Sequence, residues 1–195
     1  MNRKAELERR TRETTIRIRL DLEGGGPPDV DTGIPFFDHM LSLLGVHGFV
    51  EMTIHAQGDI DVDSHHTVED VGIVWGDALE KALGDRKGIR RYGFAVTPMD
   101  DALATVAIDL SRRPYLVFNV PSGEVAERSF NRMLAKEFFK ALSNHGGMNL
   151  HITVPYGENE HHILEAVFKS FGRALRQAVS LDERIAGVRS SKGML

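Results

Sequence analysis

One polar motif occurs twice in this sequence, at two distant places and in the same form. Each copy reads His-His-x-x-Glu, and the residues are His65, His66 and Glu69 in HHTVED and His161, His162 and Glu165 in HHILEA. The two copies are offset by 96 positions, and the dipeptide at 78–79 recurs at 174–175 with the same offset. Core formation explains repeated apolar residues, but it does not explain two polar triplets in register. We therefore infer an internal duplication.

A second pair of segments, upstream of each motif, follows the same duplication. His39 and His47 in DHMLSLLGVHG align with Glu137 and His145 in KEFFKALSNHGG, at an offset of 98. A two-residue deletion between the two aligned regions reconciles the offsets. The second half therefore carries a glutamate where the first half carries His39.

The pattern of apolar residues predicts a similar order of elements in both halves. Alternating apolar residues predict strands, and a 3.6-residue period predicts helices. In the first half the predicted elements are strands at 16–22 and 50–54 and helices at 36–46 and 65–83. In the second half they are strands at 106–110, 115–120 and 150–154 and helices at 131–142 and 161–179. Suitable N-caps precede the two histidine motifs: Asp63 or Ser64, and Asn159. We expect an α+β fold with helices packed on antiparallel sheets, in two halves, 1–91 and 92–195, of one compact domain.

Composition excludes several classes of function. The formal net charge of −4 argues against nucleic acid as the main partner, because binding a phosphate backbone needs a basic surface. The chain has no cysteine, which excludes disulfides, thiolate zinc sites and iron–sulfur clusters. The charged N-terminus lacks the apolar core of a signal peptide, and no apolar run could span a bilayer. We therefore expect a cytoplasmic protein with no membrane partner. A few converging Arg and Lys side chains could still bind a small anion.

The repeated motif has the residue types and the spacing of a metal site. In a helix, positions i and i+4 share a face, so His65 and Glu69 can reach the same point, whereas His66 is rotated by about 100°. The adjacent histidines are therefore expected to bind different metal ions, with ligands shared between the repeats. Imidazole and carboxylate ligands without sulfur suit Mn, Fe, Zn, Co or Ni, and the carboxylates favour Mn or Fe(II). A single copy could equally be a solvated capping turn, but two copies in register favour the metal site.

Several motifs together resemble the signature set of the imidazoleglycerol-phosphate dehydratase family. They are HHTVED, HHILEA, GIPFFDHML, DLSRRPYL, KGIRRYG and the C-terminal SSKG, in the family's order, and the likeness extends from Glu13 to Lys192. The resemblance implies two duplicated halves, each a four-stranded, mostly antiparallel sheet packed with helices, of the ribosomal S5 domain 2-like type. It also implies a homo-oligomer built from trimers into an octahedral cage. Each active site would lie at a subunit interface and hold two Mn(II) ions.

The reaction that the resemblance implies is the loss of water from imidazole glycerol phosphate, which gives imidazole acetol phosphate in histidine biosynthesis. The proton to be removed lies on a carbon with no adjacent carbonyl, so simple base catalysis would be slow. The implied solution is a di-metal site that binds the substrate imidazole as imidazolate, with carboxylates moving protons. Matched by position, the catalytic carboxylates are Glu13, Glu69 and Glu165. A metal-bound carboxylate is a weaker base, which favours Glu13 as the residue that removes the proton.

The same matching assigns metal ligands and substrate contacts in both halves. The implied metal ligands are His39, His65, His66, Glu69, Glu137, His161, His162 and Glu165. Glu137 stands where many members of the family carry histidine, and the duplication places it opposite His39. The implied substrate-binding residues are Glu13, His47, Arg91, Arg113, Lys169, Ser190, Ser191 and Lys192. Taken alone, Lys169 could simply pair with Glu165 at i+4, and Arg113 could be a surface charge.

Two other functions fit part of the sequence. Paired metal ions also serve the hydrolysis of phosphate esters, and histidine pairs could stabilise a metal-storage or scaffold assembly. A hydrolase would release phosphate from simple esters without an imidazole ring, and a scaffold would need no phosphate-binding residues. Neither function explains the complete set of motifs. The sequence leaves open the metal used in the cell and the order of proton transfers.

Overall fold

The computed structural model describes residues 3–121 and 130–193, and it shows the same sequence of elements in both halves of the chain. The first half contains β1 (Lys4–Arg10), β2 (Thr14–Asp21), β3 (Asp29–Asp31), α1 (Pro35–Gly48), β4 (Glu51–Gly58) and α2 (His65–Leu83). The second half contains β5 (Tyr92–Met99), β6 (Ala102–Asp109), β7 (Tyr115–Asn119), α3 (Arg132–His145), β8 (Asn149–Tyr156) and α4 (Glu160–Val179). All four predicted helices are present, and their ends lie within three residues of the predicted ends.

Each half forms one four-stranded sheet, and the two sheets have the same strand order. The orders are β1-β2-β4-β3 and β5-β6-β8-β7. The first three strands of each sheet are antiparallel, and the edge strand, β3 or β7, runs parallel to its neighbour. This identical topology confirms the predicted α+β fold of two duplicated, mostly antiparallel sheets.

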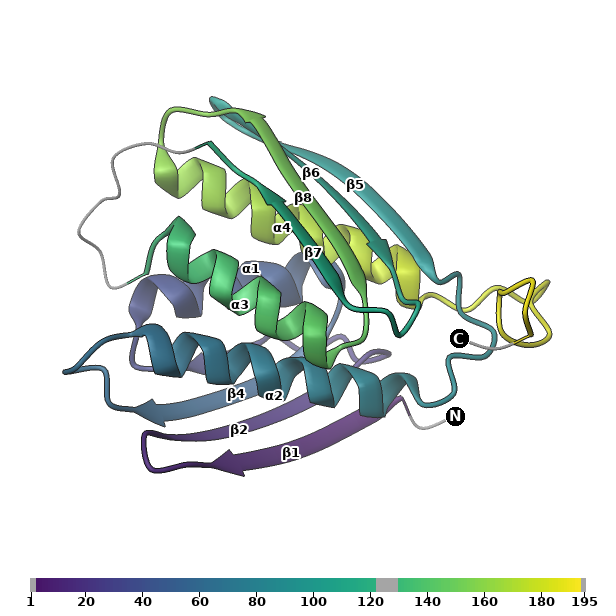
Figure 1. Cartoon of the computed structure of the whole chain (residues 1–195), viewed down its shortest axis with the longest axis horizontal. Coiled ribbons are helices and arrows are strands. Elements are labelled where there is room, and N and C mark those ends of the chain that lie inside the picture. Colours follow the sequence, from purple (N-terminus) through teal and green to yellow (C-terminus); the bar gives the residue numbers. More distant parts are fainter. Residues whose placement is uncertain (1–2, 122–129, 194–195) are drawn as a thin grey trace.

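The two sheets form the outer layers of the molecule, and the four helices lie between them (Figure 1). Helix α2 packs on β1, β2 and β4, and α4 packs on β5, β6 and β8. The helices also cross between the halves, because α1 lies against α4 and α3 lies against α2. Aromatic rings fill this layer: Trp75 of α2 contacts Phe171 of α4, for example. The two halves therefore share one core. In the described part of the chain, no helix is both long and apolar enough to cross a membrane.

Glycines at corresponding positions allow the helices of the two halves to approach closely. A Cβ atom on Gly76 of α2 would lie 2.8 Å from the backbone nitrogen of Gly146, which follows α3. A Cβ atom on Gly172 of α4 would lie 2.9 Å from the backbone nitrogen of Gly48, at the end of α1. Real Cβ atoms essentially never come this close, so only glycine fits at Gly76 and Gly172. The contact at Gly172 holds α1 beside α4, which brings residues of the first half to the histidine motif of the second.

The sequence analysis missed three strands, β1, β3 and β5, and each omission has a physical reason. In β1 only Ala5 is buried, and β3 has just three residues. In β5 the pattern is inverted, because small residues face inward and large apolar residues face outward. A Cβ atom on Gly93 would lie 1.8 Å from the carbonyl oxygen of Ala174 in α4, so the helix leaves no room for a larger side chain. The apolar side chains of β5 are therefore exposed at the surface, as with Phe94.

Candidate functional site

The two histidine motifs lie in the first turns of α2 and α4, as predicted, and polar side chains fix both helix starts. The Asn159 side chain accepts a hydrogen bond from the backbone N–H of His161 at 2.9 Å, which confirms the predicted cap. At α2 the Asp63 carboxylate accepts the backbone N–H of His65 at 3.1 Å. Ser64 occupies the N-cap position there without a side-chain hydrogen bond. Each helix start therefore holds its two histidines in a defined direction.

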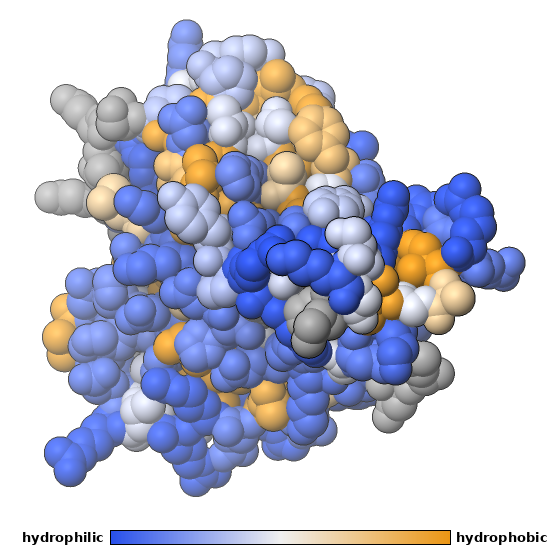
Figure 2. Space-filling model, turned by 45° about the vertical axis from the view of Figure 1, so that its right-hand side comes forward, coloured by the Kyte–Doolittle hydropathy of each residue, from blue (hydrophilic) through white to orange (hydrophobic). Residues whose placement is uncertain are grey.

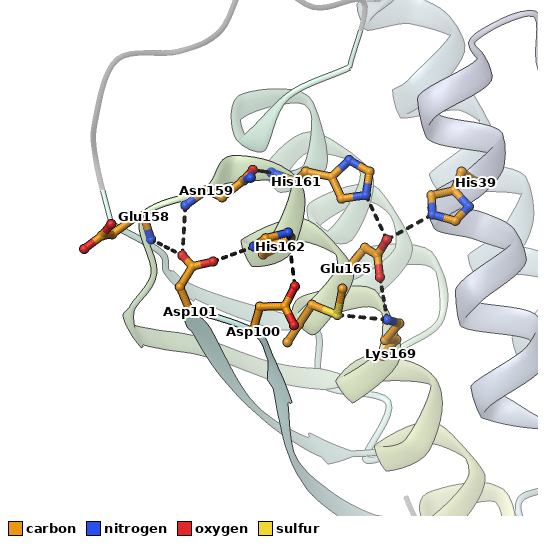
Figure 3. Close-up of polar contacts among 10 residues, drawn as sticks. His39, Asp100, Asp101, Glu158, Asn159, His161, His162, Glu165 and Lys169 are labelled. Atoms are coloured by element: carbon orange, nitrogen blue, oxygen red, sulfur yellow. Dashed lines mark hydrogen bonds and ion pairs between the residues drawn. The ribbon is translucent and has the colours of Figure 1, made fainter.

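Helices α1 and α4 bring three predicted metal ligands together from opposite halves of the chain. Nε2 of His39 lies 3.1 Å from Oε1 of Glu165, and Nε2 of His161 lies 2.8 Å from the same oxygen (Figure 3). One donor atom from each residue lies within 4.8 Å of the others. The Glu165 side chain is 9% exposed, whereas both imidazoles are partly open to solvent. The cluster is thus accessible from one side and anchored on the other.

The spacing of these donor atoms fits a divalent cation. Ligand atoms about 2.1 Å from a metal ion in an octahedral shell stand about 3 Å apart along each edge. The two contacts to Glu165, at 2.8 and 3.1 Å, have this length. Two imidazoles and a carboxylate are also a ligand set that Mn, Fe and Zn accept. His39, His161 and Glu165 therefore form a candidate metal centre.

Glu165 remains charged because its neighbours are donors. Burial raises the pKa of this carboxyl, but hydrogen bonds from Lys169, His39 and His161 outweigh burial and lower the pKa to about 2. Nζ of Lys169 contacts Oε2 of Glu165 and lies 3.3 Å from Sδ of Met99. The i+4 pairing considered from the sequence is therefore present.

Adjacent histidines point in different directions in both motifs, as the helix geometry predicts. The ring planes of His161 and His162 meet at 84°, and those of His65 and His66 meet at 88°. Nδ1 of His162 contacts Asp101, and the hydrogen bond with Asp101 is the main cause of the raised pKa of His162. The two adjacent histidines of each motif therefore do not point toward the same position.

The first-half motif forms a looser group. Nε2 of His65 lies 3.7 Å from Oε2 of Glu69, while Glu137 pairs with Lys140 at 3.3 Å on its own helix. Nδ1 of His66 lies 3.9 Å from the carboxylate of Glu13, in the turn before β2. Within residues 3–121 and 130–193, the one group of three or more candidate ligands that could hold a metal ion is that around Glu165. The eight predicted ligands thus do not gather at one point within one chain.

His47, a predicted substrate contact, lies near the end of α1. Its pKa is lowered, first by burial and then by the positive charges of Lys169 and Arg173 on α4. The imidazole is therefore held neutral, with one ring nitrogen as donor and the other as acceptor.

Five of the eight predicted substrate-binding residues line one cavity of about 520 Å³. They are Arg91, Arg113, Ser190, Ser191 and Lys192. The sequence analysis missed three further lining residues, Tyr92 and the neighbouring pair Ser111 and Arg112. The adjacency of this pair to Arg113 in DLSRRPYL is the signal that could have found it. Lys169 lies outside this cavity, beside Glu165. We call the cavity the anion pocket, because its lining has an excess of cationic side chains.

Most of the Arg91 guanidinium is engaged in hydrogen bonds that stabilise the wall of the anion pocket. The guanidinium makes two hydrogen bonds to Asp109, at 2.6 and 3.0 Å, and a third to the carbonyl oxygen of Arg189 at 2.7 Å. The bond to Arg189 ties the C-terminal segment that carries Ser190 and Lys192 to Arg91. Arg91 has two N–H groups left for a ligand.

The metal cluster and the anion pocket lie at opposite ends of α4. The backbone N–H of Arg91 donates to the carbonyl oxygen of Ala178, in the last turn, whereas His161 stands in the first turn. At about 1.5 Å per residue, His161 and Ala178 are about 25 Å apart along the helix axis. In Figure 1 the start of α4 and the C-terminal segment accordingly lie at opposite sides of the molecule.

Comparisons with known proteins agree with the fold and the motifs. The family model of imidazoleglycerol-phosphate dehydratase matches residues 32–175. Imidazoleglycerol-phosphate dehydratases of Desulfosudis oleivorans and Geobacter sulfurreducens are 60% and 53% identical to this chain, each over the full length of both proteins. Among solved structures, the enzyme of Staphylococcus aureus has a TM-score of 0.82 at 36% identity, covering 92% of this chain and 99% of its own. That of Pyrococcus furiosus has a TM-score of 0.84 at 38% identity, covering 97% and 100%. With its duplicated fold and paired histidine motifs, this chain belongs to the imidazoleglycerol-phosphate dehydratase family and is a hydro-lyase.

Proposed function

We propose that this protein dehydrates imidazole glycerol phosphate to imidazole acetol phosphate in histidine biosynthesis, with two Mn(II) ions in each active site. Membership of the family supports the reaction. The observation that carries the metal chemistry is the convergence of His39, His161 and Glu165 at spacings that suit a divalent cation. When bound, the metal ions supply Lewis acidity that favours the imidazolate form of the substrate ring.

The surroundings of each carboxylate favour a different role, either metal binding or proton transfer. Glu165 is buried, charged and close to Nε2 of His39 and Nε2 of His161, so these three residues would hold a metal ion, with Lys169 beside the carboxylate. Glu13 is 55% exposed on its side chain and lies 3.9 Å from His66, so it is free to take a proton from the substrate carbon. Glu69, the internal counterpart of Glu165, completes the ligands of the first-half motif together with His65. Lys169 keeps the Glu165 carboxylate in place while His47 contacts the substrate.

The anion pocket binds the phosphate group of the substrate. Arg113 and Lys192 supply charge, and Ser190 and Ser191 supply hydroxyl donors. In the described part of the chain, the side chains of Arg113 and Lys192 form no ion pair, so both cations are available to a ligand. Arg91 holds the pocket together through Asp109.

The separation of the metal cluster and the anion pocket within one chain supports an active site that two chains share. Counted as eight bonds of roughly 1.5 Å, the substrate reaches at most about 12 Å from ring nitrogen to phosphate oxygen. The two ends of α4 are about 25 Å apart. A neighbouring copy that supplies the anion pocket to this cluster removes the mismatch. Glu137 and the first-half histidines would complete a second metal site in the same way.

The outer face of the second sheet supports such an assembly. The β5 patch, made of Tyr92, Phe94 and Val96, is exposed and apolar. The corresponding face of the first sheet carries charged residues such as Glu6 and Arg17. Figure 2 shows apolar residues gathered over the second sheet, at the top, while the face below is largely hydrophilic. We propose that this face joins copies of the chain into trimers and that the trimers form an octahedral cage. The enzyme would act in the cytoplasm. Within the chain, the boundary between the two duplicated halves would lie between residues 91 and 92.

The test of this function is a dehydration assay on chelator-stripped protein, with and without added Mn(II). We expect imidazole acetol phosphate to form only when metal is added, because the proton to be removed is not acidic without a polarised ring. No product with any divalent metal, in protein shown to be folded, would contradict the dehydratase proposal. Phosphate release from simple esters would then favour a hydrolase.

Mixing two inactive variants tests whether active sites are shared. Glu165→Gln removes the metal cluster, and the double variant Arg113→Ala, Lys192→Ala removes the anion pocket. Co-assembled from equal amounts, they are expected to regain roughly a quarter of wild-type activity. At a shared site, the chain that supplies the metal cluster is intact there in about half of the cases, and so, independently, is the chain that supplies the anion pocket. Each variant reassembled with itself is the control. If the mixture stays as inactive as its parents, each site belongs to one chain.

A further inference from the structure

The second histidine of each motif contacts a carboxylate that no motif identified. Nδ1 of His162 lies 2.5 Å from Oδ1 of Asp101, and Nδ1 of His66 lies 3.1 Å from Oδ2 of Asp59. In both copies the contact is made by Nδ1, so Nε2 points away from the carboxylate. In Figure 3 the His162 ring accordingly lies between Asp101 on one side and Asp100 on the other, where Oδ2 is 3.4 Å from Nε2.

Asp101 is held rigidly by the start of α4. One carboxylate oxygen accepts the backbone N–H groups of Glu158 and Asn159, at 2.6 and 3.0 Å. The other oxygen faces His162. Asp101 sits in the turn between β5 and β6, so this one side chain joins the turn to the helix that carries the ligands. A carboxylate fixed in this way can fix the imidazole in turn.

In the two halves, the carboxylate that contacts the second histidine comes from different places in the duplicated fold. Asp101 lies in the turn between β5 and β6, directly before β6, and Glu13 lies in the turn between β1 and β2, directly before β2. Asp59, in contrast, directly follows β4. Because Asp59 makes the contact to His66, Glu13 is left at 3.9 Å from the same nitrogen, with a half-exposed side chain. The duplication therefore conserves the carboxylate–imidazole contact but changes which position provides it.

We propose that Asp59 and Asp101 are positioning residues, each of which accepts the Nδ1–H of its histidine and directs Nε2 toward a divalent cation. This inference rests on the proposed metal function and deepens it. A neutral imidazole has one N–H donor and one acceptor nitrogen, so a carboxylate on Nδ1 makes Nε2 the acceptor that can bind metal. In the first half, the use of Asp59 leaves Glu13 free for proton transfer. In the second half, the equivalent position is used for positioning.

The test measures Mn(II) affinity of chelator-stripped protein by the electron paramagnetic resonance signal of free Mn(II). For Asp101→Ala and Asp59→Ala we expect affinity at the affected site to fall about 10- to 100-fold, the usual effect of losing such a partner. Asp101→Asn and Asp59→Asn keep a carbonyl acceptor for Nδ1–H and are expected to restore part of the affinity. Asp61→Ala, an exposed residue on the same loop as Asp59, is the matched control and should bind like the wild type.

The unfolding temperature of the metal-free variants separates positioning from stability. Asp101→Ala also loses two bonds to the start of α4, whereas the recorded side-chain hydrogen bonds of Asp59 are all to His66. Asp59→Ala is therefore expected to unfold at the wild-type temperature and still bind Mn(II) more weakly. Wild-type affinity in both alanine variants would overturn the positioning role while leaving the metal function intact. Absence of Mn(II) binding by the wild type would instead overturn the metal function and this inference with it.

Discussion

Replacing Glu13 with glutamine is expected to lower turnover by about 10²- to 10⁴-fold, the usual contribution of a general base, with metal content unchanged. The side chain lies in the turn between β1 and β2, 3.9 Å from Nδ1 of His66, and is half-exposed. Glutamine keeps the size and polarity of this side chain but cannot take a proton. Asp59 still contacts His66, so the first-half motif should keep its ligands in place. Turnover under saturating Mn(II) and metal content by elemental analysis are the two measurements.

The matched control for Glu13→Gln is Asp61→Asn, which removes one negative charge from an exposed side chain on the neighbouring loop. It should keep wild-type turnover. A Glu13→Gln variant with normal turnover would remove this residue from the proton transfer. Loss of metal in that variant would assign Glu13 to metal binding instead.

Replacing Glu165 with glutamine is expected to remove one metal ion from each site and lower turnover by at least about 10³-fold. The carboxylate is the shared contact of His39, His161 and Lys169, and its low pKa shows how strongly these donors favour the charged form. A neutral amide is a poor ligand for a hard cation, and the Lys169 ammonium loses its counter-charge. Metal catalysis supplies several kcal/mol, and each 1.4 kcal/mol is a factor of ten in rate.

Metal content and turnover of Glu165→Gln should be compared with those of Glu158→Gln, which makes the same chemical change on an exposed side chain just before α4. The control is expected to keep both metal ions, because only the backbone N–H of Glu158 contacts Asp101. Full metal occupancy in Glu165→Gln would show that His39 and His161 bind the ion without the carboxylate. Glu165 would then have no role as a metal ligand in the cluster.

Local patterns in the sequence predicted most of the fold. The 3.6-residue period located all four helices, since one buried face repeats along each of them, and Asn159 marked the start of α4. The strands that the pattern missed owe their place to neighbours elsewhere in the chain. The inward side chains of β5 are small because Ala174 approaches Gly93. No residue near β5 in the sequence indicates that approach.

The candidate site was predicted less completely than the fold. The sequence and the family resemblance named all members of the cluster around Glu165, and helix geometry alone separated the directions of His161 and His162. Helical spacing offered the pairing of Lys169 with Glu165 as an alternative to a substrate contact, and the structure shows that pair, outside the anion pocket. The carboxylates Asp59 and Asp101 carry no motif of their own, since their role depends on which loop ends beside which histidine.

The sequence by itself determined that this protein is a duplicated α+β fold with one histidine motif at the start of a helix in each half. Those features depend on contacts within a few turns of one element, where residue spacing fixes which side chains share a face. Only the tertiary structure decided that His39 would meet Glu165, because the contact joins residues 126 positions apart. It depends on the close approach of α1 and α4 at Gly48 and Gly172. Such long-range contacts arise from the shape of the shared core, which no local pattern encodes.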